Sequence, residues 1–122
     1  MEKMILSTLS KTWILDLDGT LVKHNGYMQE EGDTLLPGAV DFIRQIPEDD
    51  FILILTSRTV ELRDQTLAFL EKHHVRYDQI IFNVPLGERI IINDRKPSGL
   101  NMAVAVNLNR DDFEMPAVER VL

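Results

Sequence analysis

Hydrophobic residues in this chain form short continuous runs, and the segments between the runs have a helical spacing. The runs lie at residues 12–17, 51–56, 79–82, 89–93 and 102–108. They are rich in isoleucine and valine and do not alternate with polar residues, which predicts strands covered on both faces. Apolar residues three or four positions apart predict helices over 37–46 and 59–74, and Pro97 is expected to begin a short third helix.

Strands that alternate with helices predict an α/β fold. We expect a doubly wound, Rossmann-like parallel sheet of about five strands with helices on both faces. The length of 122 residues predicts a single domain over 1–122, and 44% hydrophobic residues are enough for a core.

Residues 20–35 interrupt the alternation of strands and helices. Asn25 followed by Gly26 is a strong signal for a tight turn. We therefore expect a small flap or hairpin directly after the first strand. Its acidic residues are interpreted as a solvated rim: Glu30, Glu31 and Asp33. The last residues, 109–122, are expected to form a tail or short helix without recognisable chemistry.

The charge and composition exclude several classes of function. The chain has 13 Lys and Arg against 20 Asp and Glu, a net charge of -7, so bulk charge does not favour nucleic acids or anionic membranes. It has no cysteine, which excludes disulfides and thiolate metal sites. The first residues do not resemble a signal peptide, and no apolar run is long enough to span a membrane. A soluble cytoplasmic protein is the expectation.

Polar side chains follow three of the predicted strands. Asp16 and Asp18 end the first, residues 56–58 end the second and residues 93–95 end the fourth. Ligands of doubly wound sheets bind beyond the carboxyl ends of the strands, so these groups are expected to meet there. Carboxylates without cysteine suit Mg²⁺, and hydroxyls at a helix start suit phosphate. Taken alone, residues 56 and 57 fit a helix cap equally well, and residue 94 fits a turn.

Three segments resemble motifs of the haloacid dehalogenase (HAD) superfamily. "DLDGTL" is similar to its first motif, "ILILTSR" to its second, and "IIINDRKP" to its acidic fourth motif. The resemblance covers roughly residues 12–108. It implies an HAD-like fold, and because the inserted segments are short, a member with a small flap and no cap domain. The open site would be covered by a bulky substrate or by a neighbouring subunit of a homo-oligomer.

The resemblance also implies roles for individual residues. Asp16 would be the nucleophile that forms an aspartyl-phosphate, and Asp18 would be the general acid and base. Mg²⁺ would bind the Asp16 carboxylate, the Asp18 backbone carbonyl and Asp94. Phosphate would be bound by a further group of side chains: Thr56, Ser57, Arg58 and Lys96.

One position departs from the family pattern. The third motif of the family supplies a lysine to the phosphate, whereas Val84 stands at the corresponding position here. Another cation would have to replace that lysine. Lys96 is the first candidate and Arg58 the second, with Arg89 and Arg95 as further choices.

These observations favour a Mg²⁺-dependent phosphatase that acts on a small phosphate monoester, such as a sugar phosphate or an intermediate of polysaccharide synthesis. Two alternatives stay open. Because of Val84, the chain could be a binding or regulatory protein that has lost turnover. A receiver-like signalling domain is the third hypothesis, although the expected aspartate is missing after residues 79–82.

Overall fold

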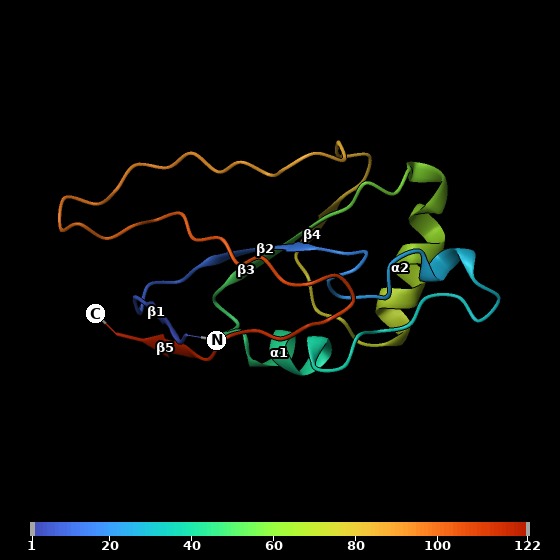
Figure 1. Cartoon of the computed structure of the whole chain (residues 1–122), viewed down its shortest axis with the longest axis horizontal. Coiled ribbons are helices and arrows are strands. Elements are labelled where there is room, and N and C mark those ends of the chain that lie inside the picture. Colours follow the sequence, from blue (N-terminus) through green and yellow to red (C-terminus); the bar gives the residue numbers. More distant parts are fainter. Residues whose placement is uncertain (1, 122) are drawn as a thin grey trace.

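The computed structural model describes residues 2–121 and is a small α/β structure with parallel strands. Three strands, β2 (Thr12–Asp16), β3 (Phe51–Leu55) and β4 (Gln79–Ile81), form a parallel sheet in the order β2-β3-β4. A separate parallel pair joins β1 (Met4–Leu6) to β5 (Val118–Arg120) near the two ends of the chain (Figure 1). Within residues 2–121, no helix is long and apolar enough to cross a membrane.

Two α-helices connect the strands of the larger sheet. Helix α1 (Ala39–Gln45) follows Gly38, which has a φ of 87°, a left-handed conformation that glycine adopts without strain. Helix α2 (Arg63–Lys72) follows a short 3-10 turn, η2 (Val60–Leu62). The strands and helices predicted at residues 12–17, 51–56, 79–82, 37–46 and 59–74 are therefore confirmed, with slightly shorter bounds.

The core lies where β2 and β3 pack against the two helices. Ile52 and Ile54 on the central strand are fully buried, as are Ala39 of α1 and Leu70 of α2. Leu17 continues β2 into this core, whereas its neighbours Asp16 and Asp18 are only partly buried. Side chains of an extended chain alternate between two sides, so burying Leu17 turns both carboxylates to the other side.

The segment after β2 folds back on itself. Lys23 donates its backbone N–H to the Thr34 carbonyl at 3.0 Å, and Leu36 donates to Leu21 at 2.9 Å. Between these bonds lies a 3-10 turn, η1 (Gly26–Met28). Asn25, the residue before it, has a left-handed backbone conformation. We call residues 20–36 the flap.

The expectation of a doubly wound sheet with about five strands is met in part, because the parallel α/β arrangement is present but the five strands form two sheets, one of three strands and one of two. Residues 89–93 and 102–108, both within the described part of the chain, form no strand, and the short helix at Pro97 is replaced by a turn. They belong to a long loop, residues 86–108, which we call the arm; it is the orange loop in Figure 1. Its apolar side chains are exposed, with Ile90 at 80% and Ile92 at 93%. Isoleucine favours strands, but a strand also needs a neighbour that supplies its hydrogen bonds, and here it has none.

The C-terminal residues also differ from the expected tail or short helix. Residues 118–120 form β5, which pairs with β1, a strand that the apolar pattern did not predict. Phe113, just before them, packs edge-on against Phe42 of α1, with ring centroids 5.4 Å apart. These contacts bring the two ends of the chain together beside α1.

Candidate functional site

The candidate site lies at the carboxyl end of β2. Asp16 is the last residue of that strand and is opposite Leu55 of β3 in the parallel register. Its side chain is 38% exposed, whereas Asp18, two residues later, is 21% exposed. The turn that follows requires Gly19, because its φ is 83° and a Cβ there would lie 3.2 Å from the Arg110 side chain. The two carboxylates therefore leave the sheet at a tightly built turn.

Arg58, which follows β3, binds the Asp18 carboxylate in a bidentate pair. Its Nε donates to Asp18 Oδ2 at 3.0 Å, and its Nη2 donates to Oδ1 at 2.8 Å. The Arg58 side chain is 1% exposed, so this pair is largely shielded from water. Two parallel bonds between a guanidinium and a carboxylate fix the position of both groups.

The same guanidinium also holds the flap. Its Nη1 and Nη2 donate to the two Asp33 oxygens at 3.0 and 2.7 Å, and the Asp33 side chain is 3% exposed. Tyr27 of the flap lies with its ring centre 4.5 Å from the guanidinium carbon, and Thr66 of α2 accepts a further bond from Nη1 at 2.9 Å. Arg58 thus joins β2, the flap and α2 in one cluster, which we call the Arg58 cluster: Asp18, Tyr27, Asp33, Arg58 and Thr66.

The Arg58 cluster contains two carboxylates for one guanidinium. Burial by itself lowers the pKa of Arg58, but hydrogen bonds and charge attraction from Asp18 and Asp33 outweigh it and leave the pKa raised above its ordinary value. Arg58 therefore stays charged at neutral pH. When both aspartates are ionised, one negative charge of the cluster has no matching positive charge.

A second arginine binds the other aspartate. Arg89, in the arm, donates from Nη1 to Asp16 Oδ1 at 2.9 Å, and Thr20 donates its hydroxyl to Asp16 Oδ2 at 3.1 Å. Both charged side chains of this pair are about one-third exposed, so water screens their attraction. Asp16 consequently has a cationic neighbour and an accessible carboxylate.

Thr56 and Ser57 shape the turn that carries Arg58. The Thr56 hydroxyl is buried and accepts the backbone N–H of Arg58 at 3.1 Å, while the Thr56 backbone N–H donates to Ile81 at 3.0 Å. Ser57 is partly buried and donates its hydroxyl to the Pro85 carbonyl at 3.4 Å. Thr56 thus closes a local turn through its own side chain, and it does not cap a helix, because η2 begins after Thr59.

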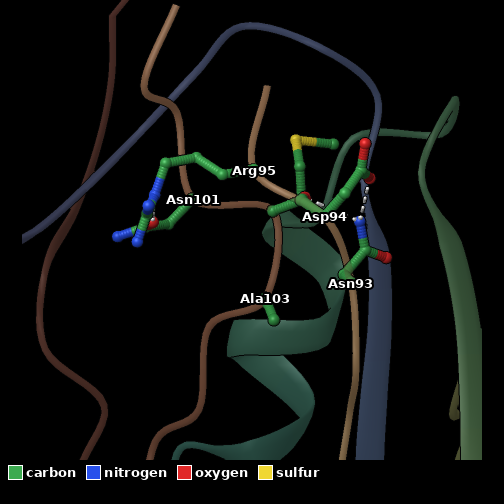
Figure 2. A pocket seen from close by; sticks show the side chains of 6 residues that line it. Asn93, Asp94, Arg95, Asn101 and Ala103 are labelled. Carbon is green, nitrogen blue, oxygen red and sulfur yellow. Dashed lines mark hydrogen bonds between the residues drawn. The ribbon is translucent and has the colours of Figure 1, made fainter. Parts of the chain in front are cut away.

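Asp94 and Lys96 lie in the arm, so the expectation that they follow directly after a strand is wrong. A pocket of about 230 Å³ lies beside Asp94, and Figure 2 shows the side chains that line it. There the Asn93 side chain donates to the Asp94 carboxylate at 3.3 Å, and Arg95 donates to the Asn101 side chain at 2.7 Å. In the described residues, 2–121, no three acidic or histidine side chains are grouped closely enough to hold a metal ion. The structure brings Asp16, Asp18, Thr56, Ser57 and Arg58 to one edge of the sheet, but it does not group Asp94 with the two aspartates.

Several residues of the site were missed from the sequence. Asp33 was interpreted as part of a solvated rim, although its carboxylate is buried against Arg58. In the tail that was expected to lack chemistry, the Asp111 carboxylate accepts the His24 backbone N–H at 2.6 Å, and the Asp111 N–H donates to Gly19 at 2.8 Å. Nothing in the local pattern marks either aspartate, because each bond joins segments that are distant in sequence or depends on the path of the flap.

Comparison with protein-family models, with curated proteins and with solved structures gives no match for this chain. A functional proposal for it therefore depends on its own residues and their geometry.

The ion pairs made by Arg58 and by Arg89 should differ sharply in how much they stabilise the folded chain. We expect Arg58→Met to lower the free energy of unfolding by about 3–5 kcal/mol, because it removes the cation from the buried Asp33 carboxylate and from the partly buried Asp18 carboxylate. Arg89→Met should cost about 0–1 kcal/mol, because its pair with Asp16 is partly exposed. Urea unfolding, monitored by the fluorescence of Trp13, measures the free energy of unfolding of each variant. Equal losses in the two variants would contradict the buried character of the Arg58 cluster.

Proposed function

We propose that this chain is a Mg²⁺-dependent phosphatase of the HAD type that hydrolyses a small phosphate monoester. The observation that carries the proposal is the position of Asp16: it is the last residue of β2, its carboxylate is accessible, and an arginine lies 2.9 Å from it. An exposed carboxylate at the end of a parallel strand can attack phosphorus, and a neighbouring guanidinium offsets the negative charge of the phosphoryl group. The HAD-like fold is part of this proposal, supported by the order β2-β3-β4 with acids after β2 and hydroxyls after β3.

In the proposed reaction, an Asp16 oxygen forms a bond to phosphorus while the bond to the leaving oxygen breaks. Asp18 gives that oxygen its proton, and then accepts a proton from the water that hydrolyses the aspartyl-phosphate and releases inorganic phosphate. Both oxygens of Asp18 accept hydrogen bonds from Arg58 in the structure. Asp18 must therefore weaken its pair with Arg58 before it can carry a proton to the leaving group.

The donors proposed for Mg²⁺ have suitable chemistry. The carboxylates of Asp16 and Asp94 and the backbone carbonyl of Asp18 are hard oxygen ligands, which Mg²⁺ prefers. Asp94 would join the other two donors only if the arm moved toward β2, because the structure does not group them. When bound, Mg²⁺ would supply positive charge that offsets the phosphoryl oxygens.

The proposal must also name the cation that replaces the lysine of the family's third motif. Val84 occupies the position where the family has its lysine, and its backbone N–H donates to the Thr56 carbonyl at 3.1 Å. Arg58 is paired with two carboxylates while the flap lies over it, and Lys96 lies in the arm beside Leu100, whose carbonyl accepts its backbone N–H. Arg89 is bonded directly to Asp16, which supports Arg89 as the replacement cation in preference to Lys96.

A second candidate function is a phosphate-binding protein without turnover. The specific observation in its favour is that Arg58 occupies both oxygens of Asp18, the proposed acid and base. Release of phosphate from an aryl phosphate ester distinguishes the two functions, because the binding protein would retain phosphate affinity and release none.

Replacing the proposed nucleophile gives the most direct test. Asp16→Asn keeps the size of the side chain but removes the attacking oxygen, so turnover of an aryl phosphate should fall by several orders of magnitude while the fold is retained. Asp41→Asn, an exposed acid on α1, is the control for the loss of one charge. Near-normal turnover in Asp16→Asn would reject Asp16 as nucleophile.

The replacement cation can be identified by comparing two variants. Arg89→Ala should lower kcat/KM by about 10²–10³-fold, the scale seen for loss of one donor that stabilises transition-state charge. Lys96→Ala should change it little. If Lys96→Ala is the damaging variant instead, the arm lysine takes this role. Introducing lysine by Val84→Lys should partly restore the Arg89→Ala enzyme.

Metal binding should appear as a gain in thermal stability. A ligand that binds only the folded state stabilises it by about 2.7 kcal/mol at one hundred times its Kd, so Mg²⁺ should raise the Tm. Asp94→Ala should remove most of this gain. A gain that is unchanged in Asp94→Ala would exclude Asp94 as a ligand, and no gain in the unmodified chain would argue against the metal itself.

A further inference from the structure

Arg58 is held from two sides by groups of different origin. Asp18 and Thr66 contact it from the sheet and from α2, whereas Asp33 and Tyr27 contact it from the flap. The flap contributes both a carboxylate and an aromatic ring, and both groups are directed at the same guanidinium. The position of the flap over Arg58 therefore depends on these two contacts.

The pair between Asp33 and Arg58 has the geometry with which arginine binds an external oxyanion. Two oxygens of one group accept from Nη1 and Nη2 at 3.0 and 2.7 Å, the fork arrangement that arginine also makes with phosphate. Asp33 thus occupies on Arg58 the place that a phosphate would take. The Asp33 side chain is 3% exposed, so phosphate cannot reach these donors while the flap is in this position.

Asp18 and Asp33 share one guanidinium, so neither carboxylate has Arg58 to itself. The Asp33 carboxylate, which is buried in this position, regains its hydration when it moves into water. Asp18 is anchored by the turn after β2, where Gly19 donates to Val22 at 2.7 Å. Asp33 lies in the flap, where the regular structure is the three-residue turn η1, and loop segments of this kind open more readily than a sheet.

We propose that Asp33 is an internal substitute for phosphate and that the flap is a latch which an incoming phosphate releases. The phosphate exchanges with Asp33 on Arg58, Asp33 moves into water, and the flap leaves the guanidinium. No covalent bond changes in this step. The inference rests on the proposed phosphate-binding role of the site, but it does not depend on turnover.

Hydrogen exchange in the unmodified chain tests the latch without any substitution. The Lys23 amide reports the flap, because it donates to Thr34, the residue next to Asp33. The Asp78 amide, which donates to Ile52 in the sheet, is the internal reference. The reference condition is chloride at equal ionic strength. Relative to it, saturating inorganic phosphate should raise the hydrogen-exchange rate of the Lys23 amide at least threefold and leave the rate of the Asp78 amide unchanged. Unchanged or slower exchange at Lys23 would overturn the latch.

A matched pair of variants tests the role of Asp33 itself. Asp33→Asn keeps the shape of the side chain but removes its charge, so exchange at Lys23 should rise without phosphate, and the Kd for inorganic phosphate should fall about tenfold. Glu31→Gln makes the same charge change on an exposed flap residue and should alter neither quantity. Equal phosphate affinity in Asp33→Asn and Glu31→Gln would overturn the proposal. If Asp33→Asn does not fold, the exchange experiment on the unmodified chain still decides.

The outcomes separate the latch from the proposed catalysis. Phosphate-induced exchange at Lys23 without turnover of any ester would support the latch and reject the phosphatase. Turnover without any phosphate effect on Lys23 would support the phosphatase and reject the latch.

Discussion

One buried guanidinium connects three parts of the chain that are far apart in sequence. Arg58 lies at the end of β3 and binds Asp18 after β2, Asp33 in the flap and Thr66 in α2. In the described residues, every buried polar atom of a side chain has a hydrogen-bond partner, and several of those partners meet at Arg58. The turn after β2 and the path of the flap both depend on this charge, because removing it would leave two acids facing each other in a place with little water.

Two acids that repel each other can end one strand because each has its own cation. Arg58 matches Asp18 in a buried pair, and Arg89 matches Asp16 in a pair that is open to water. Asp18 and Asp16 also differ in how far their side chains are buried. The partly buried Asp18 carboxylate is fixed in place by two hydrogen bonds from Arg58, whereas the more accessible Asp16 carboxylate has a partner whose attraction water screens. The proposed nucleophile is therefore the aspartate whose partner is easier to displace.

The three strands β2, β3 and β4 and the two helices could be predicted from the sequence, since each depends on a local pattern. Ile52 and Ile54 fall in a continuous apolar run, and Leu70 belongs to a helical repeat. Asp16, Asp18 and Arg58 could be placed at one edge for the same reason: they directly follow strands. Asp33 could not be assigned, because its burial depends on the flap returning to Arg58. Pairing of β1 with β5 likewise joins residues more than one hundred positions apart, which no local pattern reveals.

The arm exposes a segment that is chemically suited to self-association. Three consecutive isoleucines, 90–92, lie in extended backbone without strand partners, and short β-prone runs of this kind can stack into aggregates. Charged residues flank the run on both sides: Glu88, Arg89, Asp94, Arg95 and Lys96. Such charges act as gatekeepers that make ordered stacking of neighbouring chains costly. The pair between Arg89 and Asp16 therefore also bears on aggregation, because it holds one of these flanking charges at the base of the arm.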